Sequence, residues 1–259
     1  MPFKEVINSD KPKHELFDLG DFRVGYFTAK SKSYDKANED VLFLLEKDGA
    51  IIIGVADGAG GHPRGRDAAL AAVDSVVNEP KLFKNSELNP FRVMEKANDQ
   101  VLALKAGARC TLAFYTIHDS WFRSFSVGDS EVVYWNSVGN EVFSNIPHST
   151  VGFGVEAGLI EQEQSLDDPE RHIVTNLMGD SYIRMEGSSG IEMKKGHTVL
   201  IGTDGLFDNI SHEALKDTVA KGDFDGAFNS LLETSQAQDP EGWKKYDDIA
   251  WVLLRKVKS

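Results

Sequence analysis

The sequence predicts an α+β fold in which two antiparallel β-sheets are flanked by helices. Its apolar, strand-like runs come in groups and do not alternate strictly with helices, which disfavours a doubly wound parallel sheet. Turns of only a few residues separate neighbouring runs, as they do in antiparallel hairpins. With 259 residues, the chain is long enough to bury the core that two packed sheets need.

The first half of the chain predicts strands, then two helices, then strands again. Three strands are expected first, at 22–29, 40–46 and 50–56. A tight turn joins the last two of these strands. Apolar residues at helical spacing predict two helices, at 66–79 and 90–106. Further strands are expected within 110–135, where the short turns predict an antiparallel meander.

The second half begins with a segment, residues 145–190, that has little periodicity and many Gly, Ser and Asp residues. This composition predicts a long, flap-like surface excursion, and such segments often border a functional site. After it we expect a buried strand, two helices and a final strand, at 197–205, 211–220, 225–236 and 247–257. Because neither a repeat nor a linker interrupts the chain, we expect one domain over 1–259, with residues 1–19 as an N-terminal extension.

Composition excludes several classes of function. The net charge of -13 argues against binding to nucleic acid, which needs clustered Lys and Arg. No apolar run is long enough to cross a membrane, and the N-terminus lacks the apolar region of a secretory signal. The single cysteine, Cys110, excludes an internal disulfide and fits a reducing compartment. We therefore expect a cytoplasmic protein without a membrane partner, and we expect a monomer.

Acidic residues recur where the apolar strands begin or end. The set comprises Glu39, Asp40, Asp57, Asp129, Asp204, Asp208, Asp247 and Asp248. Any one of them alone is typical of a turn or a helix cap. Carboxylates gathered at one end of a buried sheet repel one another unless a cation lies among them. Hard divalent cations prefer oxygen ligands, and the chain has no Cys and His set for zinc, so the pattern predicts a pair of such cations.

The motifs that contain these acids also carry a family resemblance. In chain order they are "NED", "VADGAGGH", "CTLAFY", "VGDSEVVYW", "GTDGLFDNI" and "DDIAWVLL". This ordered set resembles the PP2C-type (PPM) metal-dependent serine/threonine phosphatases, and most closely the short, stand-alone bacterial members. The resemblance covers roughly residues 20–257. It implies a four-layer α/β/β/α sandwich, with helices on both outer faces of the two sheets.

The resemblance further implies a ligand set for two Mg²⁺ or Mn²⁺ ions. Asp57 would bridge the two ions. Asp204 and Asp247 would hold the first ion, and Glu39 and the backbone carbonyl of Gly58 would hold the second. Asp57, Asp204 and Asp247 are therefore the expected catalytic residues.

Other acids of the set are expected to support this centre. Asp129, Asp204 and Asp208 match positions that bind a third, weaker ion in bacterial members of the family. Asp40 would orient bound waters without contacting an ion. Asp248, next to the ligand position 247, would support the ligands in the same indirect way.

The activity that the resemblance implies is hydrolysis of phosphoserine and phosphothreonine in proteins by a metal-activated water, without a phosphoenzyme. The residues agree with direct attack by water, because no nucleophile is apparent. Cys110 is not followed by an arginine six positions later, where Thr116 stands. The expected partner is a phosphorylated protein, the product of a serine/threonine kinase.

The sequence departs from the family in the residue that binds the substrate phosphate. The family has an arginine four residues before the glutamate of the "NED" motif, and this chain has Asp35 there. Lys32, Lys36 and Arg64 are the candidates to bind the phosphate in its place. A solvated position on a loop or helix surface is the alternative for each of these three side chains.

A second departure concerns proton transfer. Ala59 stands where eukaryotic members have a histidine proposed as the general acid. We expect His62 to support the site or to cap the following helix, and a catalytic role for it is the alternative. The two departures leave an alternative function open, that of a catalytically weak or inactive phosphatase-like binding scaffold. Retention of every metal carboxylate favours the active enzyme, because a scaffold has no reason to keep acids that repel one another.

Overall fold

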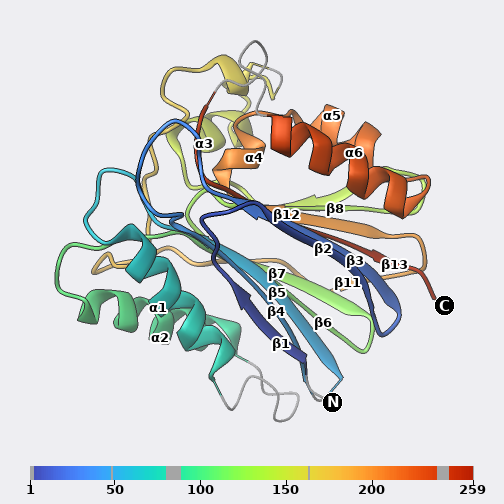
Figure 1. The fold of residues 1–259 in the computed structure, drawn as a ribbon, viewed down its shortest axis with the longest axis horizontal. Helices are drawn as coiled ribbons and strands as arrows, with labels where there is room; N and C mark the ends of the chain where they lie inside the picture. The colour runs from blue at the N-terminus through green and yellow to red at the C-terminus, as the bar shows by residue number, and fades with distance from the viewer. Residues whose placement is uncertain (1–2, 48, 80–88, 163, 238–244, 259) are drawn as a thin grey trace.

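The computed structural model describes residues 3–47, 49–79, 89–162, 164–237 and 245–258. Two antiparallel sheets pack face to face, and helices cover the outer face of each sheet (Figure 1). The fold class expected from the sequence, a four-layer α/β/β/α sandwich, is confirmed.

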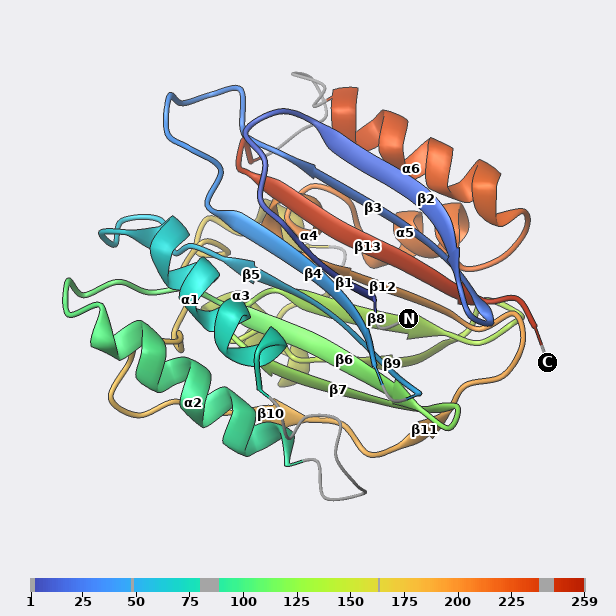
Figure 2. The ribbon, with the colours of Figure 1, turned by 60° about the horizontal axis from the view of Figure 1, so that its bottom comes forward.

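The first sheet has seven strands within the described residues, in the order β1-β4-β5-β6-β7-β10, with β11 also paired to β7. Their bounds are Phe3–Ile7 (β1), Asp40–Lys47 (β4), Ala50–Asp57 (β5), Leu112–His118 (β6), Trp121–Val127 (β7), Glu186–Gly187 (β10) and Ile191–Glu192 (β11). Two helices pack on its outer face, α1 (Gly65–Val77) and α2 (Pro90–Ala103) (Figure 2). The predicted turn between β4 and β5 contains Asp48, which lies outside the described residues.

The second sheet has six strands among the described residues, in the order β2-β3-β13-β12-β8-β9. Their bounds are Lys13–Leu19 (β2), Phe22–Ala29 (β3), Ile249–Lys256 (β13), Thr198–Gly202 (β12), Glu131–Trp135 (β8) and Glu141–Ser144 (β9). Its outer face is covered by α4 (Asp204–Phe207), α5 (His212–Val219) and α6 (Phe224–Ala237). None of the helices in the described part of the chain is long and apolar enough to span a membrane.

The central strands are buried on both faces, which explains their unbroken apolar runs. Ile51, Ile53 and Val55 of β5 pack between the two sheets. Ile52 and Ala56 of the same strand point the other way and pack with the apolar sides of α1 and α2. Because side chains alternate along a strand, a sheet between two apolar layers needs apolar residues at every position.

The N-terminal residues are part of both sheets. Residues 1–19 were expected to form an extension, but β1 pairs with β4 and β2 pairs with β3. Both are edge strands, and most side chains of β2 are exposed or half-buried. Their polar sequences therefore hide the strand pattern.

The segment 110–135 is not a continuous meander, which corrects the expectation from its short turns. β6 and β7 pair in the first sheet, but β8 pairs with β12 and β9 in the second sheet. The chain crosses between the sheets at Gly128, which has a φ of +101° and leaves no room for a Cβ beside Thr111. A short turn with this backbone geometry can join two sheets as well as two strands of one hairpin.

Residues 145–190 contain little regular structure, as expected, although a short helix was missed there. This helix, α3, spans Thr150–Glu156, and Ser149 caps it by accepting a hydrogen bond from the Gly152 amide at 2.9 Å. A single 3-10 turn, η1 (Ser165–Asp167), follows.

Candidate metal centre

The strand topology gathers the acids at one end of the sandwich. In an antiparallel pair, the end of one strand lies beside the start of its partner. Asp57, the last residue of β5, is directly opposite Asp40, the first residue of β4. Gly202, at the end of β12, is opposite Trp251 of β13. Asp204, just after β12, therefore lies near the acids that precede β13.

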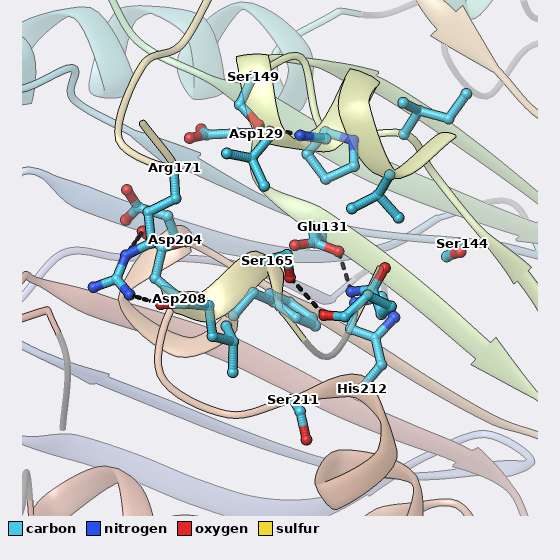
Figure 3. A pocket seen from close by; sticks show the side chains of 18 of the residues that line it. Asp129, Glu131, Ser144, Ser149, Ser165, Arg171, Asp204, Asp208, Ser211 and His212 are labelled. Carbon is cyan, nitrogen blue, oxygen red and sulfur yellow. Dashed lines mark hydrogen bonds and ion pairs between the residues drawn. The ribbon is translucent and has the colours of Figure 1, made fainter. Parts of the chain in front are cut away.

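Most of the predicted metal ligands line a single pocket. Its carboxylates are those of Glu39, Asp57, Asp129, Asp204, Asp247 and Asp248. The backbone of Gly58 also lines this pocket. Asp208 lies in a neighbouring pocket, which it shares with Asp129 and Asp204 (Figure 3). Asp40 is buried behind these residues.

Asp248 fixes the backbone that carries Glu39. Its Oδ1 accepts a hydrogen bond from the Ser31 amide at 2.8 Å, and its Oδ2 accepts one from the Glu39 amide at 2.7 Å. The Asp248 side chain is buried, and burial raises its pKa while the two amide bonds lower it. This carboxylate therefore ties the start of β13 to the loop before β4.

Asp40 is held in a similar way from the second sheet. The Thr203 hydroxyl donates to Asp40 Oδ2 at 2.7 Å, and the same hydroxyl accepts from the Ala250 amide at 3.0 Å. Asp40 Oδ1 is buried, and none of the residues that the structure describes donates a hydrogen bond to it. A buried carboxylate oxygen without a partner is free to accept from a water or another ligand.

Gly58 lies where two backbone segments meet closely. Its amide donates to the Glu39 carbonyl at 3.2 Å. A Cβ at position 58 would come within 2.4 Å of the Gly65 carbonyl carbon, at the start of α1. The Glu39 carboxylate accepts from the Arg66 amide at 3.3 Å in the first turn of that helix, where negative charge is favoured. The small residue thus lets β5 and α1 enclose Glu39.

The carboxylates of the cluster raise one another's pKa. Burial raises the pKa values of Asp40, Asp57 and Asp129 well above the usual range, and neighbouring carboxylates raise them further. The pKa of Asp208 rises to about 7, through burial first and the charge of Asp204 second. Such a cluster is stable near neutral pH only when protons or cations neutralise part of its charge.

Lys245 supplies one such cation, and sequence reasoning missed it. Its ammonium contacts Asp204 Oδ2, and lies 3.3 Å from Asp208 Oδ2 and 3.2 Å from Asp247 Oδ2. Burial lowers the pKa of Lys245, but these three carboxylates raise it by more. The only signal in the sequence was the position of Lys245, two residues before Asp247.

Two other residues of the site were also missed. The Tyr34 hydroxyl donates to Asp247 Oδ1 at 2.8 Å, and burial followed by the charge of Asp247 raises the pKa of Tyr34. Arg171 Nε lies 3.7 Å from Asp208 Oδ2. Figure 3 shows Arg171 beside Asp204 and Asp208, on the wall of the neighbouring pocket.

Of the three candidates for phosphate binding, only Lys36 lines the pocket of the metal ligands. Its ammonium is exposed and lies 4.0 Å from Glu39 Oε2. Lys32 instead donates to the Gln236 carbonyl at 3.2 Å. Arg64 donates to Asp67 at 2.7 Å and to the Leu104 carbonyl at 3.3 Å. Both of these side chains are engaged elsewhere, which corrects their expected role.

The two positions at which the sequence departs from the family are exposed. The Asp35 carboxylate faces solvent and lies 3.4 Å from Lys30 Nζ, so it does not enter the pocket. His62 is exposed and lines the pocket. It does not cap α1, because that helix begins at Gly65 with Arg64 in the capping position.

The donor set fits Mg²⁺ or Mn²⁺ better than zinc. The side-chain donors are all carboxylate oxygens, which these hard cations prefer, and Asp40 Oδ1 is an available acceptor behind them. Among the residues that the structure describes, no group of three or more His, Cys, Asp or Glu side chains is arranged to hold a metal ion as it stands.

Comparison with known families agrees with this geometry. The family model for protein phosphatase 2C matches residues 30–245 of the chain. The chain belongs to the protein phosphatase 2C family. The resemblance read from the sequence motifs is thereby confirmed, and the matched range contains all the predicted ligands except Asp247.

Several phosphatase 2C relatives are similar over much of the chain. A putative protein phosphatase 2C-type protein of Streptococcus pyogenes is 26% identical over 190 residues, which cover 69% of this chain and 76% of that protein. The probable protein phosphatase 2C 80 of Arabidopsis thaliana is 28% identical over 186 residues. That match covers 70% of this chain but only 40% of the plant protein, which is therefore much longer than the shared part.

Solved structures share the fold of this phosphatase 2C family member. The serine/threonine phosphatase of S. agalactiae superposes with a TM-score of 0.75 at 22% identity, covering 92% of this chain and 100% of that one. The catalytic domain of the phosphatase PstP, solved in complex with two manganese ions, gives a TM-score of 0.71 at 18% identity. That match covers 92% of this chain and 99% of the PstP chain.

Proposed function

We propose that this protein hydrolyses phosphoserine and phosphothreonine in proteins, with two Mg²⁺ or Mn²⁺ ions in the pocket of carboxylates. The observation that carries the proposal is the convergence of six carboxylates from separate strand ends on one pocket. Family membership supports the reaction class, and the two manganese ions of PstP support the kind of cofactor.

The ligands we propose are those that line the pocket. Asp57 would bridge the two ions, Asp204 and Asp247 would hold one, and Glu39 and the Gly58 carbonyl would hold the other. Ions bound there would lower the pKa of a water and neutralise charge on the phosphoryl oxygens.

The remaining residues would position these ligands. Asp248 holds the backbone of Glu39, and Tyr34 holds Asp247 through its hydroxyl. Thr203 orients Asp40, whose second oxygen remains free to accept a hydrogen bond from a water. Ligands fixed in this way would hold bound ions, and the water they activate, with little reorganisation during the reaction.

Lys36 is the cation best placed to attract the substrate. It lines the pocket, and its ammonium is exposed, so a phosphate dianion can reach it from solvent. The exposed side chain of His172, from the segment 145–190, borders the same pocket. We propose that this segment contacts residues next to the phosphorylated side chain, and that the substrate is a phosphoprotein produced by a serine/threonine kinase.

The test is release of phosphate from a phosphothreonine peptide by the wild-type protein, with Mn²⁺ and after chelation by EDTA. We expect turnover with Mn²⁺, loss of turnover with EDTA, and recovery when Mn²⁺ is added in excess. Bound Mn²⁺ without any release of phosphate from phosphothreonine or phosphoserine peptides would reject the enzyme and favour the binding scaffold.

A further inference from the structure

The ammonium of Lys245 occupies one end of the acidic cluster. The Lys245 ammonium donates to Asp204 Oδ2 and lies within ion-pair distance of Oδ2 of Asp208 and of Asp247. Asp208 Oδ2 is buried and has no hydrogen-bond partner among the described residues. Asp204 and Asp208 belong to the set that, with Asp129, was expected to bind a third ion. The cation at this end of the cluster therefore comes from the protein itself.

The backbone of Lys245 is fixed next to these carboxylates. The Lys245 amide donates to Asn209 Oδ1 at 2.8 Å, and Asn209 Nδ2 donates back to the Lys245 carbonyl at 2.9 Å. Asn209 directly follows Asp208 in the chain, and its Nδ2 also donates to the Gly205 carbonyl at 2.9 Å. The paired hydrogen bonds thus tie Lys245 to the turn that carries two of its three carboxylate partners.

Asp208 also faces a second cation of the protein. Arg171 Nε lies 3.7 Å from the same Oδ2 atom that Lys245 approaches (Figure 3). The Arg171 guanidinium donates as well to the Leu166 carbonyl, so it is held beside Asp208. A divalent ion bound to Asp208 would be close to two positive charges of the protein, which would repel it.

We propose that Lys245 serves as the third cation of this centre, so that the protein binds two divalent ions and has no functional third site. The inference rests on the proposed function for the two-ion site. Lys245 contacts neither Glu39 nor Asp57. It contacts Asp204 and Asp247, the other two proposed ligands, through Oδ2, so the second oxygen of each carboxylate would serve the first ion. Loss of the Lys245 ammonium would free the oxygens of Asp204 and Asp208 for a third ion, with Asp129 beside them.

The experiment counts the Mn²⁺ ions bound at saturation, by equilibrium dialysis with the free Mn²⁺ measured by electron paramagnetic resonance. It compares the wild type with Lys245→Gln, which removes the charge, and Lys245→Arg, which keeps it. Lys36→Gln is the matched control, because it removes a lysine charge from the same pocket without touching Asp204 or Asp208. We expect two ions in the wild type, Lys245→Arg and Lys36→Gln, and a third ion in Lys245→Gln.

Three bound ions in the wild type would overturn the proposal, and so would two in a folded Lys245→Gln protein. A wild-type count of three ions overturns the proposal even when Lys245→Gln fails to fold in the absence of Mn²⁺. Phosphate release is measured on the same samples. When the ion counts follow the expectation but no protein releases phosphate, the proposed enzymatic function fails while the role of Lys245 stands.

Discussion

At the scale of single residues, the acids of the pocket differ from exposed acids nearby in their surroundings. Asp57 and Asp204 face other carboxylates in a pocket, whereas the Asp35 carboxylate faces solvent beside Lys30. We expect Asp57→Asn and Asp204→Asn to lower kcat/KM at least about 100-fold, because each substitution would remove a charged ligand from the proposed metal centre. Asp35→Asn should change kcat/KM less than about twofold. Steady-state kinetics on one phosphopeptide at fixed Mn²⁺ would measure kcat/KM for each variant. Equal decreases in kcat/KM for Asp35→Asn and Asp57→Asn would contradict the prediction.

The exposed orientation of Asp35 changes what its substitution should do. An arginine at position 35 restores the residue type of the family, but the Asp35 side chain points away from the pocket. We expect Asp35→Arg to leave KM nearly unchanged. Lys36→Ala should lower kcat/KM roughly 3- to 10-fold, since an exposed ammonium contributes less to phosphate binding than a buried one. The same kinetic assay measures both, and a large gain from Asp35→Arg would show that the loop turns inward.

The sequence predicted the acids of the site better than its basic residues. Asp57 and Asp204 end apolar strands, so their positions follow from the strand pattern. Lys245 and Arg171 come from irregular segments, and their long side chains reach the carboxylates only after the chain has folded. Lys32 was expected at the site because it is close to Glu39 in the sequence. In the structure its ammonium instead donates to the Gln236 carbonyl in α6.

At the scale of elements, the connection after β1 supports the site. Asn8 Nδ2 donates to the Asn38 carbonyl at 2.8 Å and to the Asp40 carbonyl at 2.7 Å. Asn8→Ala would leave these carbonyls without that donor, and we expect it to cost about 1–3 kcal/mol of unfolding free energy. The melting temperature should fall by roughly 3–10 °C. Lys11→Ala, at an exposed position in the same segment, is the control and should change it little.

A melting temperature that is the same for Asn8→Ala and the wild type would show that these two hydrogen bonds contribute little to the stability of the fold. The strands β1 and β2 could not be read from the sequence because they are edge strands with polar, partly exposed faces. Central strands such as β5 have two apolar faces, and their patterns predicted them closely.

Helix α5 is joined to the second sheet by a histidine whose charge depends on pH. His212 Nε2 lies 2.8 Å from Glu131 Oε2 of β8, and Nδ1 lies 3.8 Å from Glu141 Oε2 of β9. Burial lowers the pKa of His212, but the two glutamates raise it to about 10, above the ordinary value of 6.5. The stabilisation from this pair should therefore be complete below about pH 6.5 and lost as the pH rises toward 10.

The check is the melting temperature of the wild type and of His212→Gln between pH 6 and pH 10, at constant ionic strength. We expect the wild type to exceed His212→Gln most at pH 6, with the difference shrinking as the pH rises. A difference that stays constant or grows toward pH 10 would mean that the imidazole is neutral in the folded protein.

At the scale of the whole molecule, the sandwich separates its apolar core residues from the acidic residues of the pocket. The three apolar layers fill the space between the sheets and under the helices, while the acids lie at the strand ends. Two antiparallel sheets flanked by helices could be predicted from the order of the elements, and the four-layer order followed from the family resemblance. The crossing between the sheets at Gly128 could not, since hairpin turns and crossings have similar lengths and residues.

The central claim is that this pocket uses two divalent ions to hydrolyse a phosphoester. The most direct measurement titrates Mn²⁺ into chelator-treated protein while bound Mn²⁺ and phosphate release from a phosphothreonine peptide are recorded on the same samples. We expect no turnover without Mn²⁺, little with one bound ion, and full turnover as the second ion binds. Full turnover in the metal-free protein, or turnover that does not change as the second ion binds, would contradict the claim.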